Sequence, residues 1–382
     1  MTSKKLLQQA FGLTLVVWLL AGCGGASAEL TATPITASVP TSIPSLFRIF
    51  QNDKAGYIDA SGQIVIQTQF EDAASFSEGL AAVRAGSLWG YIDATGRMVI
   101  QPQFDNAASF SERLAAVRVG SLWGYTDASG TMVIQSLFGN ASHFSGGRAR
   151  IRMDEKYGYI DPTGQVVVAP GYDDASDFSE EVASVMKCTP QKSCKTTTFI
   201  GSWGTITNRT GGEWSYIDPA GNPAMSPTFD GGGSFSGGLA PAKIGESWGY
   251  IDKTGAMVIQ PQFEDAHVFS EELAAIRIDK KWGYIDRTGA IVIPPQFNWA
   301  SDFSEGLAAI AIGEEHGYVD KIGAIVIRLK CLLAEDFSEG LAEVLLEDEN
   351  GEITRAYINK KGEYVWKVST STLPPAEATP TP

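Results

Sequence analysis

The chain contains few of the residues that build catalytic and metal centres. Its 382 residues include only three histidines and four cysteines. His143, His267 and His316 each stand at a different place in the repeated pattern described below, so the sequence groups them neither as metal ligands nor with a serine and an aspartate. No glycine-rich phosphate loop precedes a helical pattern. The sequence therefore predicts no metal, no cofactor and no enzyme active site.

An excess of basic residues is also missing. The chain has 29 lysines and arginines against 44 aspartates and glutamates, which gives a formal net charge of −15. An acidic surface of this size repels phosphate backbones. Nucleic acid is therefore not expected as a partner.

The N-terminus holds a hydrophobic run from Ala10 to Leu20, preceded by two lysines. The run is too short to span a bilayer as a helix and is typical of a secretory signal. It ends in Leu20-Ala21-Gly22-Cys23, which resembles the lipobox of bacterial lipoprotein signals. This resemblance implies that residues 1–22 are removed and that Cys23 carries the lipid. The alternative is an ordinary signal peptide that happens to contain a cysteine.

Both ends of the mature chain are rich in serine, threonine and proline. Residues 23–45 lack a hydrophobic period and predict a flexible tether, and residues 369–382 predict a disordered tail. With a lipid on Cys23, we expect the region between them to be held at the membrane, on the extracytoplasmic face of a bacterial cell envelope.

That region, residues 46–368, repeats one phrase. It reads Trp248-Gly249-Tyr250-Ile251-Asp252 and returns at a spacing of 34 residues, with one step of 57 and one of 39. Its tyrosine recurs at Tyr57, Tyr91, Tyr125, Tyr159, Tyr216, Tyr250, Tyr284, Tyr318 and Tyr357. A period of this size predicts a repeat protein in which each unit buries its apolar faces against its neighbours.

Each unit has the pattern of a three-stranded β-meander. Short runs rich in Val, Ile, Tyr and Trp alternate with Gly, Asp and Ser, and the motif from Asp93 to Gly96 predicts a tight turn. Two aromatics recur in the connector of most units, as at Phe70 and Phe76, and predict packing between neighbours. Because the strands are apolar on both faces, we expect small sheets stacked face to face.

The predicted fold is all-β, a tandem array of about nine meanders forming an open or incompletely closed arc. A closed β-propeller is the alternative, but nine units exceed its usual range of four to eight blades. In addition, no unit is divided between the two ends of the chain to lock a ring shut.

The phrases resemble the WG-repeat family of bacterial proteins. This resemblance implies a β-rich scaffold and no defined chemistry. The repeat-signature residues, to which it gives a structural role, are Trp89, Gly90, Tyr91, Asp93, Trp123, Gly124, Tyr125, Trp248, Gly249, Tyr250, Trp282, Gly283 and Tyr284. The chain departs from the pattern at Ser215 and Ala356, which replace the glycine.

The long step of 57 residues contains an insert at about residues 187–212. Cys188 and Cys194 lie within it and are candidates for a disulfide in an extracytoplasmic protein. The insert also holds Trp203, a candidate ligand-facing residue, because insertions in repeat arrays form loops on one face. The alternative is a protruding hairpin without a binding role.

Arginines recur at one place of the repeat and are the other candidate ligand-facing residues. Arg84, Arg118 and Arg277 could line a basic groove for an acidic glycan, or form a charge ladder that sets the strand register. The tryptophans could likewise stack on sugars or pack between units.

Taken together, these features favour a membrane-anchored extracytoplasmic repeat protein that binds or scaffolds a cell-envelope protein or polysaccharide. The alternatives are a cell-wall glycan-active enzyme that uses loop carboxylates, and a purely structural spacer.

Overall fold

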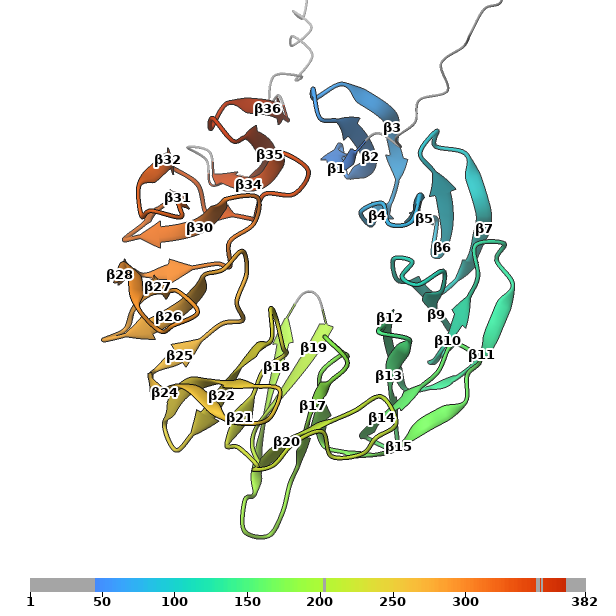
Figure 1. Ribbon diagram of the computed structural model, residues 1–382. Coiled ribbons are helices and arrows are strands. Elements are labelled where there is room, and N and C mark those ends of the chain that lie inside the picture. The colour runs from blue at the N-terminus through green and yellow to red at the C-terminus, as the bar shows by residue number, and fades with distance from the viewer. Residues whose placement is uncertain (1–44, 202–203, 348–350, 352, 369–382) are drawn as a thin grey trace, which may run out of the picture. The chain divides into compact units, whose positions relative to one another are not determined.

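The computed structural model describes residues 45–201, 204–347, 351 and 353–368. Contacts divide the chain into residues 1–42 and residues 43–382, and every described residue belongs to the second unit. In the described ranges the secondary structure is entirely β: nine small antiparallel sheets lie around a ring, and a tenth sheet is a two-stranded hairpin formed by residues 194–201 and 204–211 (Figure 1). The described part of the chain contains no helix with the length and hydrophobicity that a membrane span requires.

The nine sheets are the blades of a β-propeller, numbered here in chain order. The first three consist of β1 (Leu46–Gln51), β2 (Lys54–Asp59) and β3 (Ile64–Phe70); β4 (Asp72–Ala73), β5 (Leu80–Ala85), β6 (Leu88–Asp93) and β7 (Met98–Phe104); and β8 (Asn106–Ala107), β9 (Ala115–Val119), β10 (Leu122–Thr126) and β11 (Met132–Phe138). The next three consist of β12 (Asn140–Ser145), β13 (Arg148–Met153), β14 (Lys156–Ile160) and β15 (Val166–Tyr172); β16 (Asp174–Ala175), β17 (Ala183–Lys187) and β20 (Glu213–Ile217); and β21 (Gly231–Gly232), β22 (Leu239–Ile244), β23 (Ser247–Asp252) and β24 (Met257–Phe263). The last three consist of β25 (Asp265–Ala266), β26 (Ala274–Ile278), β27 (Lys281–Ile285) and β28 (Ile291–Phe297); β29 (Trp299–Ala300), β30 (Leu307–Ile312), β31 (Glu315–Asp320) and β32 (Ile325–Leu329); and β33 (Leu333–Ala334), β34 (Leu341–Glu347), β35 (Ile353–Asn359) and β36 (Tyr364–Lys367).

The glycine of the repeated phrase lets the outermost strand cross close to its neighbour. At Gly283 an added Cβ would lie 2.5 Å from the carbonyl oxygen of Ile293, and the register between β27 and β28 shifts at this point. A side chain there would collide with backbone. In blade 5, where Ser215 replaces the glycine, the outer strand is reduced to isolated bridges such as the one between Trp214 and Phe229.

The aspartate of the phrase closes the turn between the third and fourth strands of a blade. In blade 2 an Oδ of Asp93 accepts the backbone N–H groups of Thr95 and Arg97 at 3.0 and 3.1 Å, and Gly96 has a φ of +82°. The Thr95 hydroxyl, followed by other hydrogen bonds, lowers the pKa of Asp93 to about 2. The carboxylate thus serves the turn itself.

The predicted three-stranded unit was incomplete, because the connector contributes a fourth, innermost strand. In blade 2 this strand is β4, and it continues into a turn in which Glu78 and Gly79 both have positive φ, at 51° and 82°. Such a turn joins β4 to β5 in the type I′ geometry. The strand has only two residues, too few to show an alternating pattern in the sequence. The innermost strand, the turn and the start of the next strand are called the inner hairpin below.

The predicted open arc is wrong, because the first and last blades pack against each other. Phe47, Ile49 and Ile58 of blade 1 form one buried cluster with Leu341 and Tyr357 of blade 9. The rings of Phe47 and Tyr357 lie 5.6 Å apart. No blade is divided between the two ends of the described chain, and side-chain packing closes the ring without strand exchange.

A candidate binding groove where the ring closes

At the junctions between successive blades, the tyrosine of the phrase contacts the inner hairpin of the following blade. Tyr284 donates a hydrogen bond from its hydroxyl to the carbonyl oxygen of Ser301 at 2.8 Å, and its ring lies 4.8 Å from that of Phe303. Burial raises the pKa of Tyr284. The corresponding hydroxyl bonds link Tyr57 to Ala74, Tyr91 to Ala108, Tyr125 to Ser142, Tyr159 to Ser176, Tyr216 to Gly233, Tyr250 to His267 and Tyr318 to Glu335.

A serine in each inner hairpin bonds to the next hairpin around the ring. Ser145 donates from its hydroxyl to the carbonyl oxygen of Phe178 at 2.7 Å. The same bond joins Ser77 to Phe110, Ser111 to Phe144, Ser179 to Phe235, Ser236 to Phe269, Ser270 to Phe303 and Ser304 to Phe337. Among the described residues, every pair of successive inner hairpins has this contact.

The turn glutamate adds a second link in the same direction. Glu305 accepts the backbone N–H of Gly340 at 3.0 Å and forms an ion pair with Lys360 at 2.9 Å. Lys360, followed by the Gly340 amide, lowers the pKa of Glu305 against the opposing effect of burial. The glutamate link recurs from Glu78 to Arg113, Glu112 to Gly147, Glu180 to Gly238 and Glu271 to Gly306.

Both links are interrupted where blade 9 meets blade 1. Blade 1 contains only β1, β2 and β3, so the described residues provide no inner hairpin between those of blades 9 and 2. In the described structure, the hydroxyl of Ser338 and the carboxylate of Glu339 bond to no following hairpin. Likewise, the carbonyl of Phe76 and the N–H of Gly79 bond to no preceding one. All four residues line a groove of about 930 Å³, called the junction groove below.

Exposure of the same residue types shows the effect of this interruption. Ser338 is exposed, whereas Ser304, one blade earlier, and the corresponding serines of the other described hairpins are half-buried. Phe76 is half-buried, whereas Phe303 is only 2% exposed. The junction groove is therefore the place where the inner wall of the ring is uncovered.

Two features of blade 1 partly replace the missing hairpin. Phe47 stands where the other blades have a small residue such as Ala81, and it fills the face of Tyr357 that a connector phenylalanine would cover. The Tyr357 hydroxyl donates to the carbonyl oxygen of Arg48 on the edge of β1 at 2.8 Å. The ring therefore closes, but the polar groups of the junction groove remain without these links.

The junction groove is acidic. Five carboxylates and two arginines line it, and they are Glu78, Glu335, Asp336, Glu339, Glu343, Arg48 and Arg355. Arg355 forms an ion pair with Glu343, and Arg48 donates to the carbonyl oxygen of Ala73 at 2.8 Å. Burial, followed by the neighbouring acid Glu343, raises the pKa of Glu335, and burial also raises that of Asp336.

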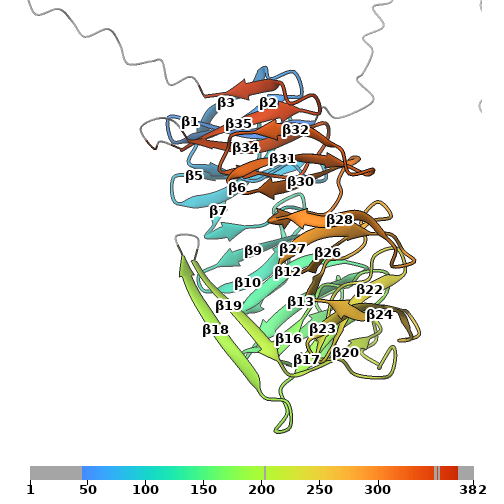
Figure 2. The ribbon, with the colours of Figure 1, turned by 90° about the vertical axis from the view of Figure 1, so that its left-hand side faces the viewer.

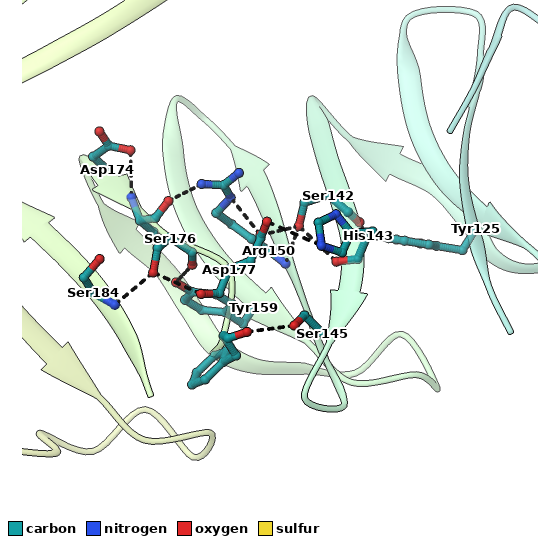
Figure 3. A network of polar contacts seen from close by, with 12 residues as sticks. Tyr125, Ser142, His143, Ser145, Arg150, Tyr159, Asp174, Ser176, Asp177 and Ser184 are labelled. Atoms are coloured by element: carbon teal, nitrogen blue, oxygen red, sulfur yellow. Dashed lines mark hydrogen bonds and ion pairs between the residues drawn. The ribbon is translucent and has the colours of Figure 1, made fainter. Parts of the chain in front are cut away.

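Polar side chains elsewhere on the inner wall have partners from neighbouring blades. In Figure 3, Arg150 lies beside Asp177, which also accepts a hydrogen bond from Ser142 at 2.7 Å. On another part of the wall, His267 pairs with Asp302 at 2.9 Å, and this bond raises the pKa of His267. No group of three or more potential metal-ligating side chains was found among the described residues.

Eight segments of the chain match the family model described as WG containing repeat. They are residues 56–89, 89–123, 123–157, 157–187, 214–247, 248–282, 282–314 and 317–349. The chain belongs to the WG repeat family. The resemblance noted in the sequence is thus confirmed. No curated relative matches the sequence.

Solved structures with a similar arrangement have low sequence identity. The dihydro-heme d1 dehydrogenase NirN in complex with DHE is 12% identical, with a TM-score of 0.42 over 86% of this chain and 73% of that one. PorZ of Porphyromonas gingivalis is 10% identical, with a TM-score of 0.32 over 83% of this chain and 45% of that one. KlHsv2 with loop 6CD replaced by a Gly-Ser linker is 7% identical, with a TM-score of 0.39 over 77% of this chain and 98% of that one. Since these scores are below 0.5, the nine-bladed ring rests on the contacts within the WG repeats themselves.

The arginines predicted to face a ligand lie on separate blades, in β5, β9 and β26. Arg84, Arg118 and Arg277 stand opposite the phrase tryptophans in the strand register. The Arg277 guanidinium lies 5.6 Å from the centroid of the Trp282 ring and 3.4 Å from a carboxylate oxygen of Glu264. None of these three arginines lines the junction groove.

The tryptophans pack within the ring. Trp282 is 7% exposed and belongs to the core between blades 7 and 8, while Trp89, Trp123 and Trp248 are half-buried against their own junctions. The tryptophans therefore contribute to the packing between blades.

The insert forms a two-stranded hairpin, β18 (Cys194–Gly201) and β19 (Gly204–Gly211), which Figure 2 shows along one face of the ring. A disulfide joins Cys188 to Cys194 at its base, with the two Cα atoms 5.4 Å apart. Trp203 and the predicted lipid anchor Cys23 lie outside the described residues. Cys331 is a buried free thiol, and burial raises its pKa to about 11.

The residues of the junction groove are not evident as a site in the sequence. One sequence feature indicates them. The tyrosine of the phrase occurs nine times, but the connector phrase, as in Phe76-Ser77-Glu78-Gly79, occurs only eight times, with variations. The first unit, which begins at Leu46, therefore has no connector phrase before it.

Proposed function

We propose that this WG-repeat protein is a membrane-anchored binding scaffold on the extracytoplasmic side of a bacterial cell envelope, and that it engages an envelope protein through the junction groove. One observation carries the proposal. The serine hydroxyl and the connector carbonyl that link every successive pair of described inner hairpins are open at this junction, together with the carboxylate of Glu339 and the N–H of Gly79.

The chemistry of the groove favours a protein over a polysaccharide. The inner edge of β1 has unpaired backbone groups among the described residues, and such an edge binds extended peptide by adding a strand. Sugar recognition commonly uses exposed aromatic faces, but the phrase tryptophans are packed into the blade junctions. A polysaccharide is thus the less favoured, alternative partner.

The membrane anchor is supported by sequence alone. Leu20-Ala21-Gly22-Cys23 matches the lipobox pattern residue by residue, and the segment from residue 23 to residue 45 has the composition of a tether. Several acyl chains on Cys23 would hold the protein stably at a membrane, whereas one chain binds only marginally.

Site-specific crosslinking in intact cells tests the binding function. A photoreactive residue in place of Glu339 should form an adduct with an envelope protein, because this side chain is exposed at the groove. The matched control is Glu246, which is exposed in the turn between β22 and β23 and does not line the groove. Equal adducts at both positions would contradict the proposal, and an adduct sensitive to glycosidases but not to proteases would favour the polysaccharide.

Fractionation of cells tests the anchor separately. The Cys23→Ala variant should lose incorporation of a labelled fatty acid and move from the membrane fraction to the soluble extracytoplasmic fraction. Unchanged labelling and membrane residence would remove the lipid from the proposal.

A further inference from the structure

We infer that the junction groove is the place of a ninth inner hairpin, and that it accepts an extended segment of a partner protein that ends in a Ser-Glu-Gly turn. This inference rests on the proposed binding function and names the chemistry of the partner. The template is the chain itself, because its own inner hairpins show which atoms meet at a filled junction.

The strand register shows where the segment would pair. Leu46 of β1 corresponds to Leu307 of β30, since each stands opposite the aspartate that begins the turn after the next strand. In blade 8, β29 pairs with Ile310 and Ala311 of β30, and the corresponding residues of β1 are Ile49 and Phe50. Among the described strands, β1 pairs only with β2, so an antiparallel strand could pair along its inner edge and would share the Arg48 carbonyl with the Tyr357 hydroxyl.

Four groups of the groove would meet the turn of the segment. From blade 9, Ser338 would donate its hydroxyl to a carbonyl of the segment and Glu339 would accept a turn N–H, as Ser304 and Glu305 do at the preceding junction. From blade 2, the Gly79 N–H would donate to the segment's glutamate, and the Phe76 carbonyl would accept from its serine. Hydrogen bonds to charged groups contribute more than neutral ones, so the two carboxylate contacts should dominate the affinity.

The residues that precede β1 do not have the sequence of this hairpin. In register with Leu307, the position of Glu305 falls on Pro44. Glu305 has a φ of +53°, and the turn glutamates of the other described hairpins have φ values of +50° to +53°. Proline has a φ fixed near −65°, so it cannot take this turn position. We therefore assign the occupant to another protein.

Phe47 determines which side chain the segment carries at the aromatic position. In filled junctions a connector phenylalanine packs on the tyrosine of the preceding blade, as Phe337 does on Tyr318 at 4.7 Å. At the closing junction Phe47 packs on Tyr357 instead, with the ring centroids 5.6 Å apart. The segment should therefore have a small residue there, followed by Ser-Glu-Gly.

Binding of synthetic peptides to the full-length protein tests the inference. The probe has the sequence of residues 71–80 with alanine in place of Phe76, and fluorescence anisotropy measures its affinity. We expect saturable binding, and we expect a peptide with proline in place of Glu78 to lose it. If the two peptides bind equally, or if the probe does not bind, the inference is overturned.

Paired protein variants locate the binding. Ser338→Ala with Glu339→Gln should weaken the probe by about 10-fold or more, because a hydrogen bond to a carboxylate is lost together with a hydroxyl bond. The matched control is Ser304→Ala with Glu305→Gln, the same two residue types at a filled junction, which should leave the affinity within about 2-fold. Equal weakening by both pairs would place the peptide elsewhere and contradict the inference.

The aromatic position gives an independent test. Wild-type protein should bind the alanine probe at least as well as the unmodified peptide of residues 71–80, because Phe47 fills the site. The Phe47→Ala variant should reverse this order. An order that does not depend on residue 47 would show that the segment does not lie against Tyr357.

A variant that fills the groove with a hairpin of its own chain provides a further test. Replacement of residues 36–45 by a copy of residues 70–79, combined with Phe47→Ala, places a complete hairpin in register before Leu46. This variant should lose probe binding and gain thermal stability.

The peptide and crosslinking experiments distinguish the two proposals. Probe binding without crosslinking at residue 339 in cells would contradict the scaffold function alone. Crosslinking without probe binding would instead contradict the hairpin inference alone.

Discussion

The junction between blades 7 and 8 and the junction between blades 9 and 1 contain the same tyrosine but different surroundings. Tyr284 is covered by an inner hairpin that accepts its hydroxyl bond and packs a phenylalanine on its ring. Tyr357 instead bonds to the edge of β1 and packs on Phe47, which comes from a strand rather than from a hairpin.

This difference shows that closing the ring and filling its inner wall are separate tasks. Closure needs apolar contact between the first and last blades, which the cluster around Ile49 and Tyr357 provides. The inner wall needs one hairpin for each junction, and the described blade 1 has none. A stable ring can therefore keep an open groove at one junction.

The largest contrast is expected from the connector phenylalanines. Phe303→Ala removes a ring that is 2% exposed, and should lower the free energy of unfolding by about 3–5 kcal/mol because it leaves a cavity in a close-packed junction. Phe76→Ala removes a ring that is half-buried beside the junction groove, and should cost clearly less. Urea unfolding of both variants measures the difference, and equal losses would show that the groove is covered in solution.

The tyrosine hydroxyls should show a smaller contrast. Tyr284→Phe leaves the buried carbonyl of Ser301 without its donor, which costs about 1–3 kcal/mol. Tyr357→Phe should cost less, because the Arg48 carbonyl that loses its donor lies on an open strand edge. Thermal unfolding of the two variants measures the loss of stability in each. A greater loss for Tyr357→Phe than for Tyr284→Phe would contradict this prediction.

The turn glutamates should differ by about 1 kcal/mol or less, since ion pairs near the surface are weak. Glu305→Gln disturbs the contacts with Gly340 and Lys360, whereas Glu339→Gln disturbs no such contact among the described residues. The pKa of Glu305 is lowered in the folded protein, so its contribution is present above its unfolded pKa and lost as pH falls through the folded value. Melting temperatures should therefore separate the variants at pH 7 and converge as the pH falls through the folded pKa of Glu305, and a separation that persists at still lower pH would contradict this assignment.

The smallest expected effect concerns the acids of the junction groove. Burial raises the pKa of Asp336, so the folded state binds this proton more tightly and is destabilised as pH rises through the folded pKa. Asp336→Asn should therefore raise the melting temperature more at pH 8 than at pH 4. A gain that does not depend on pH would mean that the carboxylate keeps its ordinary environment.

Much of the fold could be predicted from local sequence patterns. The tyrosine of the phrase, at a spacing of 34 residues, indicated nine units, and Asp93 with Gly96 indicated a tight turn. The packing of Phe303 on Tyr284 follows the expectation that recurrent aromatics lie between neighbours. These features are local and repeated, so each copy reinforces the others.

The innermost strands and the binding groove could not be read in the same way. A strand such as β4 has two residues and no periodicity of its own, and it forms only because β5 offers a partner. The junction groove depends on Phe76 and Glu339, which are 263 positions apart in the chain and come together only when the ring closes. Arg277, which the sequence placed either toward a ligand or in a charge ladder, lies against Trp282 and beside Glu264.

The sequence by itself determined the β-repeats, their number and their turns, because each depends on residues within one unit of the chain. The tertiary structure alone decided whether the array closes, because closure depends on how the small twist and tilt between successive sheets add up over nine units. It also decided which backbone groups are left open, since Glu339 has the sequence of its counterparts and differs from them only in what lies beside it.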